Sequence, residues 1–158
     1  MAQHACAMAC LIWIVASQSF GQEPDKLEHV RSFYVDSFGD KAGCAELRAS
    51  VVAGLRRLHG IRVVADRTRA DAIVSGTGEI WIRGYYSLNP RVRNVTSDAR
   101  AIYDGYLSVE LKGSHDEILW SYLVTLRRPR NGGVARNLAD QMVKRIGSVI
   151  GGKSKPPA

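Results

Sequence analysis

The sequence predicts an α/β fold of the α+β type, a two-layer sandwich in which two helices cover one face of a mixed sheet of about five strands. Three observations lead to this prediction. Two segments place apolar residues at spacings of three and four, as amphipathic helices do. Five segments are rich in β-branched and aromatic residues, as strands are. The resulting order, β-α-β-β-β-β-α, buries its apolar surfaces most simply by packing both helices on the sheet.

The first strand and the first helix are expected in succession. Residues 32–38 combine aromatic and β-branched side chains and read as a strand. Residues 43–58 read as a helix, with Asp40 as a candidate N-cap and Gly60 as a left-handed stop. The apolar face of this helix is expected to consist of Cys44, Leu47, Val51, Leu55 and Leu58.

Two strands are expected after this helix. Residues 61–65 form a short apolar run, and residues 72–85 form a longer one after an intervening turn. Gly76 and Gly78 suggest a bend in the longer strand, because a glycine in a strand interior often marks an irregularity. A polar loop at 86–99 follows.

An antiparallel pair and a second helix complete the predicted domain. Residues 101–112 and 118–128 form the pair, the turn at 113–117 joins them, and residues 135–150 form the helix. The side chains expected to point into the core are Leu107, Val109 and Leu111, then Ile118, Trp120, Tyr122, Val124 and Leu126, and on the helix Leu138, Met142, Ile146, Val149 and Ile150.

The domain organisation follows from length and from the two ends of the chain. With 158 residues, of which 46% are apolar and 23% charged, the chain fits one globular domain. We expect a signal peptide at 1–21, a single α/β domain at 22–150 and a disordered basic tail at 151–158. No internal repeat and no interdomain linker is evident in the sequence.

The signal prediction depends on the uncharged apolar run at 5–16. This run is shorter than the roughly 20 residues that a membrane-spanning helix needs. The positive amino-terminal region typical of a signal is missing, since the first 25 residues contain no Lys or Arg. Cys10 follows Ala7-Met8-Ala9, a poor match to a lipobox, so we expect no lipid anchor. The mature protein is expected to be periplasmic or secreted, without a transmembrane span.

No motif in the sequence indicates catalysis, a metal or a cofactor. The four histidines share no metal-ligand spacing. Cys44 falls on the apolar helix face, which favours a buried side chain over a reactive thiol. Ser114, His115 and Asp116 are the nearest approach to a nucleophile–base pair, and they are merely neighbours in a predicted turn. We therefore expect no catalytic residue, no metal site and no cofactor.

Arginine is the most unusual part of the composition. The chain carries 22 Lys and Arg against 15 Asp and Glu, and the net charge is +7. Arginine binds carboxylates and phosphates through its planar guanidinium, although a solvated basic surface is the simpler interpretation. Loops at 86–100 and 127–136 gather many of these charges. The candidate binding residues are Arg83, Arg91, Arg93, Arg127, Arg128 and Arg130.

One segment resembles a known group of proteins. Residues 69–78, Arg-Ala-Asp-Ala-Ile-Val-Ser-Gly-Thr-Gly, are similar to the "ADAIVTG" strand of bacterial envelope proteins. This group includes the TolB amino-terminal domain, the curli secretion lipoprotein and the activator lipoproteins of penicillin-binding proteins. The resemblance implies an interaction or assembly module and carries over no functional residue.

Three functions remain open at this stage. The first is a secreted or periplasmic non-catalytic interaction or assembly module that binds an envelope protein or an anionic polymer. The second is nucleic-acid binding through the arginine clusters. The basic composition and the interleaved Arg and Tyr residues support this hypothesis. The third is a small secreted hydrolase. The sequence leaves the identity of the partner and the oligomeric state undetermined.

Overall fold

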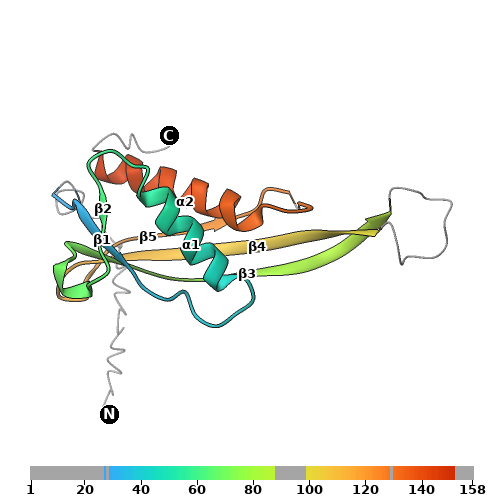
Figure 1. The fold of residues 1–158 in the computed structure, drawn as a ribbon, viewed down its shortest axis with the longest axis horizontal. Helices are drawn as coiled ribbons and strands as arrows, with labels where there is room; N and C mark the ends of the chain where they lie inside the picture. Colours follow the sequence, from blue (N-terminus) through green and yellow to red (C-terminus); the bar gives the residue numbers. More distant parts are fainter. Residues whose placement is uncertain (1–26, 28, 88–98, 129, 152–158) are drawn as a thin grey trace, which may run out of the picture.

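Five strands form one sheet in the order β2-β1-β3-β4-β5, and both helices lie on the same face of it (Figure 1). The computed structural model describes residue 27 and residues 29–87, 99–128 and 130–151. Over these residues the predicted α+β sandwich, with its mixed sheet and two helices, is confirmed. The elements are β1 (Ser32–Val35), α1 (Cys44–Leu55), β2 (Arg62–Val63), the short 3₁₀ helix η2 (Arg67–Arg69), β3 (Ala72–Ser87), β4 (Ala99–Lys112), β5 (Ile118–Thr125) and α2 (Val134–Ile150).

Strand β1 runs parallel to both of its neighbours, and β4 is antiparallel to both β3 and β5. A carboxylate fixes the start of β1 beside the start of β3. One carboxylate oxygen of Asp71 accepts hydrogen bonds from the backbone N–H groups of Arg31 (3.0 Å) and Ser32 (2.8 Å). The Ser32 hydroxyl in turn accepts one from the backbone N–H of Asp71 at 3.0 Å.

These contacts predict a pH dependence of stability. The hydrogen bond from the Arg31 backbone, followed by those from Ser32, lowers the pKa of the Asp71 carboxyl below its ordinary value. A group whose pKa is lower in the folded state stabilises the fold above its unfolded pKa, about 3.9, and this stabilisation is lost as the pH falls through the folded pKa. We expect Asp71→Asn to reduce the free energy of unfolding at neutral pH and to flatten its decline at acidic pH. Urea denaturation of both proteins at several pH values measures this. If the free energy of unfolding of the variant declines toward acidic pH as steeply as that of the wild type, the prediction is contradicted.

The core lies between the sheet and the two helices. Leu107, Val109 and Leu111 of β4 are fully buried, as their alternation predicts. Cys44 is 2% exposed, and its thiol donates to the backbone carbonyls of Phe38 and Gly78 at 3.2 and 3.0 Å. The prediction of a buried cysteine is therefore confirmed. The buried residues of the helices are Cys44, Leu47, Val51, Gly54 and Leu55 on α1, and Val134, Ala135, Leu138, Ala139, Met142, Val143, Ile146 and Ile150 on α2.

The two helices approach each other closely at a glycine. A Cβ placed on Gly54 of α1 would lie 2.7 Å from Cγ2 of Val143 on α2. Val143 is buried and β-branched, so it has little freedom to move away. On α2, a Cβ placed on Gly147 would lie 3.4 Å from the nearest atom of Leu58, an ordinary contact.

This difference predicts opposite effects for the same substitution. Alanine is a better helix former than glycine by about 1 kcal/mol. We expect Gly147→Ala to stabilise the protein by up to about 1 kcal/mol, and Gly54→Ala to destabilise it by about 1–3 kcal/mol because the helices must separate. Thermal and chemical unfolding of the two variants show whether each substitution stabilises or destabilises the protein. Stabilisation by both would show that α1 and α2 are not in close contact at Gly54.

Several details of the sequence prediction are wrong, and one is that α1 ends at Leu55 and not at residue 58. The N-cap of α1 is Gly43, in a left-handed conformation without a side-chain cap, and not Asp40. The register of β3 is regular through Gly76 and Gly78, and its irregularity lies between Ile82 and Gly84. On β5, Ile118 is 51% exposed, because a register shift pairs it with Lys112 while Trp120 pairs with Leu111.

The β3–β4 hairpin extends well beyond the helices (Figure 1). We call its distal part, residues 80–87 and 99–105, the arm. Where the arm begins, the backbone N–H of Ile80 donates to the carbonyl of Ala42 at 3.0 Å. Large apolar side chains of the arm are exposed to solvent: Trp81 (41%), Ile82 (47%) and Tyr85 (61%).

Candidate functional site: a basic groove between β5 and α2

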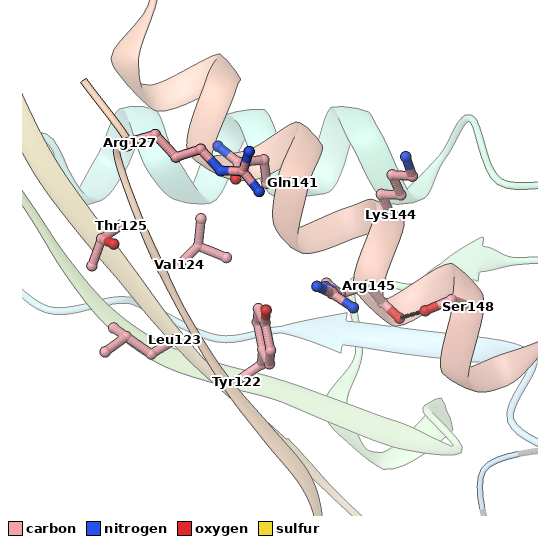
Figure 2. Close-up of a pocket in the computed structure, with 9 residues that line it drawn as sticks. All are labelled: Tyr122, Leu123, Val124, Thr125, Arg127, Gln141, Lys144, Arg145 and Ser148. Carbon is pink, nitrogen blue, oxygen red and sulfur yellow. Dashed lines mark hydrogen bonds between the residues drawn. The ribbon is translucent and has the colours of Figure 1, made fainter. Parts of the chain in front are cut away.

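The outer edge of the sheet and one side of α2 form a groove (Figure 2). Strand β5 is the edge strand, and α2 packs against both β4 and β5. The apolar stripe of α2 faces the core, and a polar stripe lies beside it. The polar stripe has helical spacings of three and four and consists of Gln141, Lys144, Arg145 and Ser148.

The groove consists of two adjoining hollows, each of about 530 Å³. They share Arg127 and Gln141, so they form one continuous surface. The first hollow lies along β5 and the polar stripe of α2, and the second follows the β5–α2 loop. We call the lining as a whole the basic groove. Its polar and aromatic residues are Tyr122, Thr125, Arg127, Arg128, Arg130, Asn137, Gln141, Lys144, Arg145 and Ser148.

Aromatic stacking and hydrogen bonds hold the side chains of the first hollow. The Arg145 guanidinium lies 5.1 Å from the ring centroid of Tyr122, within the range of a cation–π interaction. Tyr122 stacks on Trp120, with centroids 5.7 Å apart and planes 12° apart. Figure 2 shows Arg145 directed from α2 toward Tyr122, with Lys144 extending away from the sheet. The amide of Gln141 donates to Asn137 at 2.9 Å.

Arg130 is fixed through its backbone. Its N–H donates to the carbonyl of Tyr103 at 2.9 Å, and its carbonyl accepts from the Tyr103 N–H at 2.6 Å. This bridge continues the edge of β4 beyond the end of β5. The side-chain amide of Asn131 also donates to the hydroxyl of Tyr86 at 2.9 Å. The β5–α2 loop is thereby attached to both strands of the arm.

The charged side chains that line the basic groove are all cationic in the described part of the chain. Among the described residues, the lining contains five cations and no carboxylate: Arg127, Arg128, Arg130, Lys144 and Arg145. None of the ion pairs found among the described residues involves any of the five. The carboxylate of Asp140, on α2, instead pairs at 2.8 Å with Arg57, which lies just after the end of α1. Guanidinium groups without an internal partner are available to bind carboxylate, sulfate or phosphate groups of a ligand.

The structure brings together some of the predicted binding residues and not others. Arg127, Arg128 and Arg130 lie in the basic groove. Arg83 lies on the arm, where it pairs with Asp104 at 3.0 Å. Arg91 and Arg93 fall outside the described residues. Lys144 and Arg145 were not among the predicted residues, although their position beside the apolar stripe of α2 can be read from the helical spacing.

The turn between β4 and β5 does not assemble a catalytic relay. The Ser114 hydroxyl lies 3.1 Å from Nδ1 of His115. The carboxylate of Asp116 accepts a hydrogen bond from Arg67 at 2.7 Å, so it is engaged away from His115. Among the described residues, no group of three or more His, Cys, Asp and Glu side chains is placed to hold a metal ion.

Comparison with known proteins gives only distant similarities in structure. No family model and no curated protein matches the sequence. A PelC dodecamer from Paraburkholderia phytofirmans is similar over 77% of this chain and 89% of that chain, with 15% identity and a TM-score of 0.49. A neuraminyllactose-binding hemagglutinin homolog from Helicobacter pylori is similar over 80% and 87%, with 12% identity and a TM-score of 0.33. Similarities this distant assign no ligand, partner or assembly state to this chain.

Neither helix of the described part of the chain has the length and apolar character that crossing a bilayer requires.

Proposed function

We propose that the protein is a non-catalytic binding module for an anionic polymer, and that the polymer lies in the basic groove. The observation that carries this proposal is that five cations and no carboxylate line one continuous groove in the part of the chain that the structure describes. The signal-like start of the sequence supports a periplasmic or secreted location for this binding. The resemblance of residues 69–78 to bacterial envelope proteins supports the same location.

The shape of the basic groove favours an extended ligand over a small one. Small-molecule sites enclose most of the ligand surface in a largely apolar pocket. The basic groove instead runs along a strand edge and a helix, and its charged side chains are spread over both hollows. A chain with acidic groups at regular intervals would contact several of these cations at once, while a single small anion would contact one or two.

Binding to polygalacturonate, a polymer with a carboxylate on every sugar, tests the proposal. We expect the full chain to bind this probe and the affinity to fall steeply with salt, since each ion pair formed releases counterions. Dextran, which is uncharged, should not bind in the basic groove. Affinity for polygalacturonate that does not change between low and high salt would contradict the proposal.

Single-stranded DNA is the probe for the nucleic-acid alternative. It would use the same cations, with Tyr122 as the one aromatic ring in the groove on which a base could stack. Tyr122 already stacks on Trp120 and lies under Arg145, which leaves little of its face for a base. We expect DNA to bind no more tightly than polygalacturonate at equal salt. Much tighter binding of DNA would favour the alternative.

A further inference from the structure

The face of the sheet opposite the helices carries a second cluster of side chains with different chemistry. The fully buried Leu107, Val109 and Leu111 of β4 point toward the helices, so the alternate residues of β4 point to the other face. We call this second face the open face. No helix of the described residues covers it (Figure 1). Cross-strand partners share a face, and the rows on the open face are Trp81–Asp104, Glu79–Tyr106–Thr125, Thr77–Ser108–Leu123 and Ser75–Glu110–Ser121.

Two aromatic rings lie together at the junction of the open face and the arm. The ring centroids of Trp81 and Tyr106 are 6.4 Å apart, with an angle of 54° between the rings. Trp81 is 41% exposed, although a large aromatic side chain usually gains free energy by burial. Its exposure is fixed by strand register, because Trp81 lies opposite Asp104 on the open face, which no helix of the described residues covers.

An ion pair flanks the two rings on each side. Lys41 pairs with Glu79 at 2.8 Å and lies 6.0 Å from the ring centroid of Tyr106. Arg83 pairs with Asp104 at 3.0 Å, and Asp104 also accepts from the N–H of Gly105 at 2.9 Å. The hydrogen bond to Glu79, followed by that to Tyr106, raises the pKa of Lys41, which keeps the amine cationic. We call these six residues the aromatic site: Lys41, Glu79, Trp81, Arg83, Asp104 and Tyr106.

We propose that the aromatic site binds an uncharged glycan, with a sugar ring stacked on Trp81. The local charge supports an uncharged ligand, because two cations are balanced by two anions. A polyanion would gain no net electrostatic attraction from these two paired sets of charges, and a second copy of this chain, with its net charge of +7, would be repelled by the first. This proposal does not depend on the one made for the basic groove.

The chemistry of the aromatic site matches that of a sugar in two respects. The C–H face of a pyranose ring is apolar and flat enough to cover an indole, while its hydroxyls point outward around the rim. Carboxylates accept hydrogen bonds from such hydroxyls, and guanidinium and ammonium groups donate to them. The neighbouring rows of the open face add the hydroxyls of Thr77 and Ser108, which both donate and accept. A longer glycan could therefore continue along the sheet.

An array of uncharged oligosaccharides, followed by calorimetry with the best-bound member, tests this proposal on the full chain. We expect at least one uncharged oligosaccharide to bind, Trp81→Ala to weaken that binding by about tenfold or more, and Trp81→Phe to retain most of it. Tyr85→Ala is the matched control, because Tyr85 is also an exposed aromatic of the arm but pairs with Ala101 outside the aromatic site. It should leave the affinity unchanged.

Two outcomes would overturn the proposal. One is that no uncharged glycan binds the wild-type chain. The other is that Trp81→Ala leaves glycan binding intact while it abolishes self-association in analytical ultracentrifugation, which would assign the aromatic site to a second copy of the chain. Thermal unfolding shows whether each variant is folded. The Trp81→Ala variant should bind polygalacturonate as the wild type does. A failure of the glycan proposal is therefore distinguishable from a failure of the proposal for the basic groove.

Discussion

Replacing Arg127, Lys144 and Arg145 together by glutamine is expected to lower the affinity for polygalacturonate by about a hundredfold at low salt. Each of these side chains lines the first hollow of the basic groove. An exposed ion pair with a carboxylate contributes up to about 1 kcal/mol, and about 2.8 kcal/mol from the three pairs together corresponds to a hundredfold change in affinity. Glutamine keeps a polar side chain and removes the charge. Binding assays at several salt concentrations should also show a weaker salt dependence for this variant.

The control variant removes three positive charges, as the groove variant does, but at positions outside the basic groove. Arg56, Arg62 and Arg136 are exposed and line neither hollow of the basic groove. Their joint replacement by glutamine lowers the net charge from +7 to +4, as the groove variant does. We expect the control to lose no more than a few-fold in affinity. If both variants lose affinity equally, binding depends on net charge and not on the basic groove.

Replacing Gly76 by alanine is expected to cost about 2–3 kcal/mol of stability, near the upper end for overpacking by a methyl group. A Cβ at this position would lie 2.6 Å from the backbone oxygen of Ser108 and 3.3 Å from the ring of Phe38. The oxygen belongs to the neighbouring strand and cannot turn aside as a side chain could. Phe38, which is 2% exposed, packs over the bare backbone of Gly76. A larger residue would displace both the strand and the ring.

Gly84 on the same strand provides the comparison for Gly76→Ala. No atom of the described residues lies within 4 Å of a Cβ placed there. We expect Gly84→Ala to change the free energy of unfolding by no more than about 0.5 kcal/mol. Urea denaturation of both variants measures the difference. Equal stability of Gly76→Ala and the wild type would show that Phe38 and β4 do not approach β3 at Gly76.

Local patterns in the sequence predicted the core well. The alternation at Leu107, Val109 and Leu111 predicted which face of β4 is buried, and helical spacing predicted the faces of α1 and α2. The prediction failed at Ile118, where alternation alone places the side chain in the core. A register shift reverses that alternation, and such a shift depends on the pairing partner and not on the strand itself.

The candidate sites were less predictable because they are built across elements. Arg127 and Arg145 are far apart in the sequence and meet only because α2 packs beside the edge strand β5. Trp81 and Tyr106 come together through the register of two long strands. Composition showed that arginine is abundant, but only tertiary structure shows that Arg83 pairs with Asp104 while five other cations share one groove.

The most direct test of the central claim is to map where an anionic polymer contacts the protein. Backbone amide shifts of the ¹⁵N-labelled chain, titrated with a short oligomer of galacturonate, locate the contact residue by residue. The basic groove predicts the largest shifts at 122–128 of β5 and its loop, and at 141–148 of α2, with little change at Trp81 or Asp104 on the open face. Shifts confined to the open face, or spread evenly over exposed arginines, would contradict the assignment of polymer binding to the basic groove.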